Sequence, residues 1–304
     1  MGIKMDGKKA NLMLLVAAFV WGSGFVGSQY ALDAGLTPFQ LICGRMFIGS
    51  ICLCVFFYKK LKTINMAEVK VGLVIGLCLF LGFVFQTYGL QYTTPSVNAF
   101  VTAVYVVLTP FIRWLIIKEK PDVYANFGAV LTVIGIGFIS LTDGFNLSIG
   151  IPLTLLCSLA YAFQVVLTDK YTKEYDPINL TVIIIVFNFI LALLASGFFA
   201  LTRHDLPAFS WKGAFSILYL GTICTFIAYI GQNVGQKYTT AVKAAIIMSL
   251  EAVFGTALSA IIYGEILTGQ MVLGCIIVFC AIIISETKLE FLNFGANKRS
   301  KANS

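Results

Sequence analysis

The sequence predicts an all-α integral membrane protein of ten transmembrane helices, built as two inverted five-helix repeats with both termini in the cytoplasm. Composition is the first observation behind this prediction. Of the 304 residues, 59% are hydrophobic and 12% are charged, whereas about a quarter of an ordinary soluble domain is charged. The second observation is that apolar runs near ~20 residues, the length at which a helix crosses the hydrocarbon core, recur along the chain. The third is an internal repeat.

The apolar runs are continuous rather than alternating, which favours helices over strands. Breaks rich in Pro, Gly and Asp separate them. Pro38, Pro95 and Pro177 stand near predicted helix starts, where a missing N–H costs no hydrogen bond. The expected helices cover residues 11–31, 38–57, 70–91, 96–117, 122–141, 150–169, 177–201, 213–235, 243–263 and 269–288.

The internal repeat is clearest where GLQYTTPSVNAF at Gly89–Phe100 recurs as GQKYTTAVKAAI at Gly235–Ile246. A shift of 146 positions keeps residues 86–140 and 232–286 in register without a gap. It also pairs Glu119 with Glu265. The identities fall on glycines and polar residues, which chance apolar similarity would not favour. Related halves within a membrane are typical of secondary transporters.

Basic residues predict the orientation, because cytoplasmic loops carry the excess of Lys and Arg. Eighteen of the 21 basic residues fall on one side of the predicted helices. Arg203 and Lys212 fall on the other side, and Arg45 lies within a span. This distribution places both termini in the cytoplasm of a multi-pass protein of the plasma membrane. Five helices per repeat is an odd number, so the second copy must enter the membrane from the opposite side.

The domain prediction follows from the repeat: residues 1–147 and 148–290 form the two halves, and residues 291–304 form a polar cytoplasmic tail. Composition also excludes several classes. The one histidine and the spacing of the eight cysteines predict no metal site, cofactor or catalytic cluster. The basic residues form no face outside short loops, which argues against nucleic-acid binding. The sequence also contains no phosphate-binding loop for ATP hydrolysis. The chain is therefore not expected to be an enzyme.

The chain resembles the drug/metabolite transporter superfamily, specifically its EamA-type ten-helix members. In the first half, the resemblance is carried by Val20–Ser23, Pro38–Arg45, Leu108–Pro110 and Lys118–Lys120; in the second, by Ser249–Phe254, Tyr263–Glu265, Gln270 and Gly274. It spans essentially the whole chain. It implies export or exchange of small metabolites through a central cavity lined by the first, third, fourth, sixth, eighth and ninth helices. The fifth and tenth helices would lie at the periphery.

Glu251 is the sharpest candidate for a functional residue. A carboxylate about two turns into the helix at 243–263 is costly unless it is protonated, hydrated or paired. It is expected to face the cavity, where it would bind a substrate ammonium group or exchange protons; the alternative is a packing carboxylate satisfied by neighbouring side chains. Arg45, also deep in a span, would bind a substrate carboxylate, or else pair inward or extend to the interface.

Two facing stripes are expected across the repeats. Asn98, Thr102 and Tyr105 share one helix face, and Met248 and Glu251 occupy the positions equivalent to Thr102 and Tyr105. These stripes would form two walls of one cavity, or would instead supply hydrogen bonds between helices.

Five further polar or aromatic positions complete the candidate site. Gln86 and Gln232 are repeat-equivalent amides suited to a zwitterionic or hydroxylated ligand, with backbone capping as the alternative. Trp21 lies mid-span in the first helix, and Tyr161 and Gln164 lie in the sixth. Aromatic walls bind apolar or cationic cargo, although Trp and Tyr serve equally in packing. Glu119 and Glu265 are expected to complement the N-termini of the helices that follow them.

The leading hypothesis is a secondary transporter that exports amino acids or related metabolites by alternating access, because one deep acid, one deep arginine and several amides suit a zwitterion. Its expected partners are a small-molecule substrate, the lipid bilayer, and protons or a counter-substrate. The alternatives are a transporter of drugs, hydrophobic cations or lipids, and a channel or structural membrane protein.

Overall fold

The computed structural model describes residues 6–140, 148–203, 210–239 and 241–287, and over these residues it contains helices and no strands. The helices are α1 (Gly7–Asp33), α2 (Pro38–Phe56), α3 (Tyr58–Leu61), α4 (Met66–Leu90), α5 (Pro95–Ile117), α6 (Val123–Ser140), α7 (Gly150–Tyr171), α8 (Pro177–Arg203), α9 (Trp211–Tyr219), η1 (Leu220–Ile227), α10 (Ala228–Lys237), α11 (Ala241–Leu258), η2 (Ser259–Tyr263) and α12 (Gly269–Thr287). The all-helical class is confirmed.

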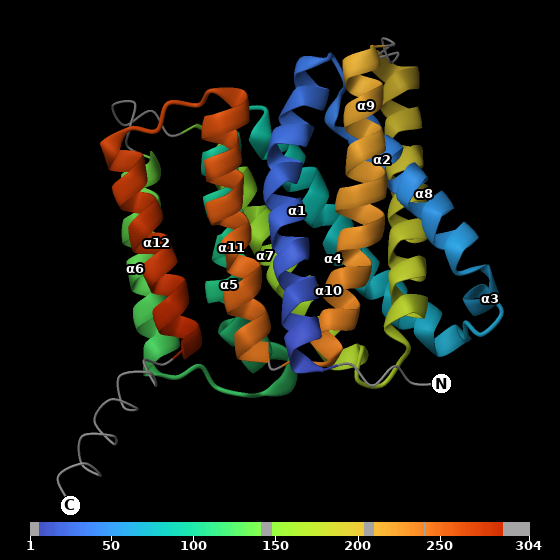
Figure 1. Ribbon diagram of the computed structural model, residues 1–304, viewed down its shortest axis with the longest axis horizontal. Coiled ribbons are helices and arrows are strands. Elements are labelled where there is room, and N and C mark those ends of the chain that lie inside the picture. Colours follow the sequence, from blue (N-terminus) through green and yellow to red (C-terminus); the bar gives the residue numbers. More distant parts are fainter. Residues whose placement is uncertain (1–5, 141–147, 204–209, 240, 288–304) are drawn as a thin grey trace, which may run out of the picture.

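The two halves of the bundle run in opposite directions. In Figure 1, α1 rises from the lower to the upper end, whereas α7, the first helix of the second half, descends. Likewise α6 rises and α12 descends. The start of α1 and the end of α12 therefore lie at the same, lower end of the bundle.

Helix contacts follow this two-fold relation. α1 packs along α11, and their counterparts α7 and α5 pack along each other. α2 packs on α8, and α6 packs on α12. The α6–α12 pair stands at one edge of the bundle (Figure 1), where the resemblance placed the fifth and tenth helices. Small residues bring this pair close, since a Cβ added to Gly135 would lie 3.0 Å from the carbonyl oxygen of Gly274.

Side-chain caps set several helix starts. The Thr37 hydroxyl accepts a hydrogen bond from the Gln40 N–H, and the Gln40 side chain accepts one from the Thr37 N–H, which forms a capping box ahead of Pro38. Asn65 and Glu68 form a second capping box. This box explains why α4 begins at Met66 rather than at the predicted residue 70, because it satisfies the N–H groups of a polar first turn.

The lengths and the apolar composition of the helices fit a membrane protein. Seven helices of the described chain are long and apolar enough to span a bilayer, and shorter apolar helices cover Val123–Ile139, Ile247–Tyr263 and Gly269–Ser285. Large apolar side chains such as Leu201, 82% exposed, face outward. Polar side chains lie inside: Asn188 is fully buried and donates to the carbonyl oxygen of Gly76 at 2.9 Å. This inside-out polarity suits a lipid environment.

The span predicted at 213–235 is not a uniform α-helix. It consists of α9, the π-helical segment η1 and α10. A π-helical turn holds one residue more than an α-helical turn and is often found at functional sites. Apolar periodicity could not predict it, because the residues on both sides continue the same hydrophobic run.

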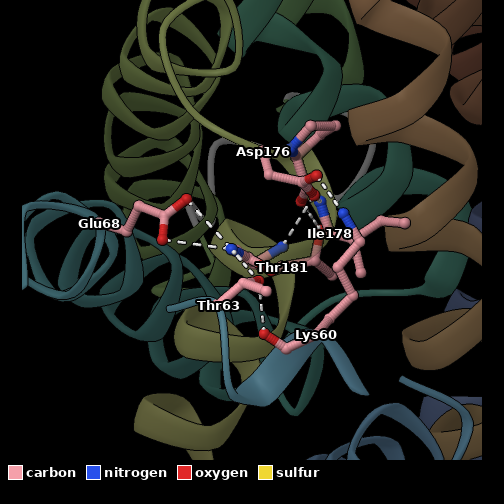
Figure 2. A network of polar contacts seen from close by, with 8 residues as sticks. Lys60, Thr63, Glu68, Asp176, Ile178 and Thr181 are labelled. Atoms are coloured by element: carbon pink, nitrogen blue, oxygen red, sulfur yellow. Dashed lines mark hydrogen bonds and ion pairs between the residues drawn. The ribbon is translucent and has the colours of Figure 1, made fainter. Parts of the chain in front are cut away.

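A polar network ties the start of α8 to α3, to Thr63 and to the first turn of α4 (Figure 2). The Asn179 amide donates to both carboxylate oxygens of Glu68 and to the Thr63 hydroxyl, each at 3.2 Å. Lys60 forms an ion pair with Asp176. These contacts hold the first half to the second at one end of the bundle.

Candidate functional site

A central cavity of about 650 Å³, including its open part, lies between helices of both halves. Its walls come from α1, α2, α4, α5, α7, α10 and α11, which are the helices that the resemblance implied, together with α2. Nine predicted residues line it: Trp21, Arg45, Gln86, Tyr105, Tyr161, Gln164, Gln232, Met248 and Glu251. The structure therefore brings most of the candidate set together around one space.

Glu251 is a buried wall of this cavity. It is 9% exposed, and within the described part of the chain its carboxylate has no hydrogen-bond or ion-pair partner. Its repeat counterpart Tyr105 lines the same cavity from α5. A carboxylate in such a place requires water, a proton or a cationic ligand.

Arg45 reaches the same cavity from α2 and is 5% exposed. Its Nε donates to the Thr225 hydroxyl at 3.2 Å, and its guanidinium carbon lies 4.5 Å from the centre of the Phe83 ring. No carboxylate pairs with it among the described residues. Its burial shows that Arg45 does not extend to the interface, and it forms no inward ion pair with the described side chains.

Aromatic side chains form much of the remaining wall. The Trp21 indole N–H donates to the Cys224 carbonyl oxygen at 2.9 Å, and its ring meets that of Tyr229 edge to face at 5.1 Å. Across the cavity, Tyr161 packs on Phe83 at 6.0 Å between ring centres. These rings are fixed by hydrogen bonds and by one another, so they provide a preformed apolar surface.

The two repeat-equivalent glutamines differ. Gln86 is engaged on both ends of its amide, since it donates to Thr102 at 3.3 Å and accepts from the Tyr161 hydroxyl at 3.2 Å. Among the described residues, the Gln232 amide nitrogen donates only to the Met248 sulfur, at 4.0 Å, and the buried Oε1 has no hydrogen-bond partner. The open acceptor of the pair is therefore on Gln232. Gln164 donates to Thr168 at 3.0 Å.

Asn98 and Thr102, both predicted for the cavity, do not line it. Asn98 is fully buried and donates to the Thr154 hydroxyl at 2.9 Å and to the Gln86 carbonyl oxygen at 3.3 Å. Thr102 is 1% exposed and receives the Gln86 amide. Both side chains join α5 to α4 or α7, which is the hydrogen-bonding role that was the alternative for this stripe.

Phe83 and Tyr229 line the cavity but escaped the sequence prediction. The signal was present, because a shift of 146 positions pairs them and each stands three residues before one of the equivalent glutamines. Residues three apart share a helix face. Applying the repeat to apolar as well as polar positions would have found both.

The two ends of the α5–α11 contact differ. At the upper end, Glu265 accepts hydrogen bonds from the N–H and hydroxyl of Ser96 at 3.2 and 2.7 Å, which holds the start of α5 against the end of η2. Glu265 thus caps α5 rather than the following α12. Its counterpart Glu119 is paired with Arg113 at 2.6 Å.

At the lower end, a second cavity of about 1160 Å³, including its open part, lies between α5, α6, α7, α10, α11 and α12. Its outer walls include Arg113, Glu119 and Lys120. Tyr105, Val165 and Met248 line both this lower cavity and the central one. These three side chains thus form the partition between the two spaces.

The fold and the cavity define a multi-pass membrane protein made of two oppositely oriented helical halves around an internal polar site. The EamA-like transporter family matches the chain twice, over residues 8–141 and 148–287. The chain belongs to this family and is a membrane transporter. The predicted boundary at residue 147 and the predicted tail at 291–304 fall outside the described residues.

Individual relatives agree with this assignment. The chain is 35% identical over 282 residues to an uncharacterized transporter of Archaeoglobus fulgidus, covering 92% of this chain and 86% of the relative. It is 26% identical over 280 residues to the uncharacterized transporter YdfC of Bacillus subtilis, covering 90% of each. A crystal structure with 15% sequence identity superposes with a TM-score of 0.68, covering 94% of this chain and 99% of the other. That likeness supports the fold.

Proposed function

We propose that this transporter is a secondary carrier that exports amino acids or closely related zwitterions across the plasma membrane. One observation carries the proposal: Arg45 and Glu251 line the same cavity, and neither has an oppositely charged partner among the described side chains. A substrate with a carboxylate and an ammonium group would satisfy both. The aromatic wall would accommodate its side chain.

Alternating access supplies the mechanism. The contact between Glu265 and Ser96 joins α5 to η2 at the upper end, whereas the lower cavity reaches the Arg113–Glu119 pair at the other end. In an inverted repeat, the opposite state follows from exchanging the two halves' conformations. The partition of Tyr105, Val165 and Met248 would then separate the site from the lower end in one state and admit substrate in the other.

Orientation in the membrane follows from the basic residues. Lys59, Lys60, Lys118, Lys170 and Lys173 sit at or beyond helix ends that share the lower end of the bundle. We assign this end to the cytoplasm because Lys and Arg are retained there. The lower cavity then faces the cell interior, which suits loading of cargo for export. Protons or a counter-substrate would drive the cycle.

Counterflow in proteoliposomes tests the proposal. Proteoliposomes that contain the purified protein are loaded with an unlabelled amino acid. The labelled amino acid, its amide or its N-acetyl derivative is then supplied outside, over a panel of amino acids. Saturable exchange of at least one amino acid is expected. Arg45→Gln should raise the half-saturation concentration for the amino acid about tenfold or more while sparing the amide. Glu251→Gln should act in the same way on the amino acid and spare the N-acetyl derivative.

Lys173→Gln is the matched control, because this exposed lysine at the lower end lies outside the cavity. It should leave exchange unchanged. No exchange of any amino acid would reject the cargo class, and exchange of a hydrophobic cation instead would favour the drug-transporter alternative. Flux that rises linearly without saturation would indicate a channel. Comparing an imposed pH gradient with counterflow identifies the driving partner.

A further inference from the structure

The span made of α9, η1 and α10 contains one residue that its counterpart α4 lacks, and the π-helical segment η1 holds it. Before η1, α9 corresponds to α4 with a shift of 145: Gly72 of α4 packs on Ile183 of α8, and Ile217 of α9 packs on Gly44 of α2 in the equivalent contact. After η1, Gln86 and Gln232 correspond with a shift of 146. The extra residue therefore falls within Leu220–Ile227, where the wider π turn accommodates it.

A second pair of contacts fixes the same shift. A Cβ on Gly76 would lie 3.5 Å from the carbonyl oxygen of Ile184, and one on Gly221 would lie 3.0 Å from that of Arg45. Gly221 and Gly76 are 145 positions apart, and Ile184 stands in α8 where Arg45 stands in α2. The crossing of α2 with the second half is therefore the counterpart of the crossing of α8 with α4.

These two crossings differ in chemistry. In α8, the counterpart of Arg45 is Ile184, which is 2% exposed. In α4, the positions that correspond to Thr225 are those of Leu79, 1% exposed, and Phe80. Apolar side chains are thus sufficient to pack this crossing in one half. A buried arginine within a span is costly, so the pair of Arg45 and Thr225 is not explained by packing.

The hydrogen bonds of Thr225 define which edge of Arg45 remains available. The Thr225 hydroxyl donates to the Leu220 carbonyl oxygen at 2.8 Å, five residues back, as the π turn allows. Its one proton is thereby used, and the oxygen accepts from Arg45 Nε. Phe83 covers one face of the guanidinium. The edge that carries the two Nη groups is left for the cavity, and this edge binds a carboxylate through two parallel hydrogen bonds.

We propose that Thr225, set in place by the extra residue of the π-helical segment, is a positioning residue that aims the Nη edge of Arg45 into the cavity as a carboxylate-binding fork. This inference rests on the proposed function for the identity of the ligand. The positioning itself is independent of which ligand binds.

Arginine-selective ¹⁵N NMR tests the positioning without a substrate. The chain has four arginines, and loss of one Nε–H signal in Arg45→Lys assigns that of Arg45. This proton should exchange slowly with water in the unmodified protein and in Thr225→Ser, which keeps the hydroxyl. In the isosteric Thr225→Val it should exchange about tenfold faster or more. Unchanged exchange in Thr225→Val, or fast exchange in Thr225→Ser, would overturn the proposal.

Counterflow then tests the fork, with the best amino acid of the panel and its amide. Thr225→Val should raise the half-saturation concentration for the amino acid about tenfold, leave maximal flux nearly unchanged and spare the amide, and Thr225→Ser should restore binding. An equal effect on acid and amide would reject the carboxylate fork while the NMR result decides the positioning. If no amino acid is transported, amino acids are rejected as the cargo. The hydrogen-exchange rate of the Arg45 Nε–H then decides the role of Thr225.

Discussion

Glu265 accepts two hydrogen bonds from Ser96, one from its backbone N–H and one from its hydroxyl, although the two residues are 169 positions apart. The carboxylate thus caps a helix of the opposite half. Its repeat counterpart Glu119 makes an ion pair with Arg113 instead. The same residue type at equivalent positions therefore makes different contacts at the two ends of one bundle.

The Glu265–Ser96 contact predicts a measurable coupling. Glu265→Gln and Ser96→Ala should each destabilise the protein, and the double variant should be less destabilised than the sum by about 1 to 3 kcal/mol, because a charged acceptor strengthens both hydrogen bonds. The free energies of unfolding of the unmodified protein and the three variants, measured in mixed micelles, give this coupling. Glu119→Gln combined with Ser96→Ala is the control and should be additive within about 0.5 kcal/mol. If the effects of Glu265→Gln and Ser96→Ala are additive, the hydrogen bonds between these two residues do not hold the upper end of the bundle together.

Lys118 predicts a stabilising substitution. It ends α5 with φ of 67°, and its repeat counterpart Gly264 has φ of 73°. A side chain in this left-handed conformation costs about 1 kcal/mol, which glycine avoids. Lys118→Gly should therefore raise the free energy of unfolding by about that amount. Lys120→Gly should give no gain, because glycine relieves no strain there. A lower stability for Lys118→Gly would contradict the prediction.

The Lys60–Asp176 pair predicts a pH dependence at the lower end. Burial acts to raise the pKa of Asp176, but the hydrogen bond and charge of Lys60 and the N–H groups of Ile178 and Asn179 outweigh it and hold the pKa below its usual range. The stability this carboxylate contributes is therefore complete above about pH 3.9, the ordinary aspartate value, and is lost as the pH falls through the lower value in the folded protein.

Acid titration of thermal unfolding measures this effect. Below about pH 4, the unfolding midpoint of the unmodified protein should fall more steeply with decreasing pH than that of Asp176→Asn, which lacks the titrating group. Glu174→Gln, at an exposed position beside it, should retain the slope of the unmodified protein. Equal slopes for Asp176→Asn and the unmodified protein would show that the pair does not couple to folding.

Gly22 predicts an intolerant position at the centre of the bundle. A Cβ there would lie 2.7 Å from Phe254 Cβ and 2.8 Å from the Gly255 nitrogen, so α1 and α11 would have to separate. Gly22→Ala should cost about 1 to 3 kcal/mol and reduce the yield of folded protein in detergent. Gly197→Ala is the control, since no neighbour lies within 4 Å of its added Cβ. It should be neutral or slightly stabilising.

Much of the fold was predictable because its signals are local or repetitive. Apolar run length predicted the membrane helices, and proline predicted the starts of α2, α5 and α8. Polar residues deep in the spans predicted most of the cavity lining, because burying a polar side chain in a membrane is costly unless it has a partner or a function.

The remainder depended on contacts that no local pattern contains. The extra residue in η1 lies upstream of Gln232, where the gapless repeat begins, so the register gave no sign of it. The exclusion of Asn98 from the cavity follows from Thr154, which its amide reaches on another helix. Glu265 was expected to cap the helix next in sequence, but the fold brings the start of α5 closer to it.

The asymmetry between Arg45 and Ile184, and between Glu251 and Tyr105, has a consequence for how such a protein can arise. Two identical half-length chains joined as a dimer would place every charge in the cavity twice, once from each subunit. A cavity lined by one such guanidinium and one such carboxylate is open to a chain in which the two copies are joined and mutate independently, but not to a dimer of identical halves. The one-residue difference at η1 records that freedom: the fused halves keep a common architecture, and their separate histories give the cavity a polarity that a symmetric dimer cannot have.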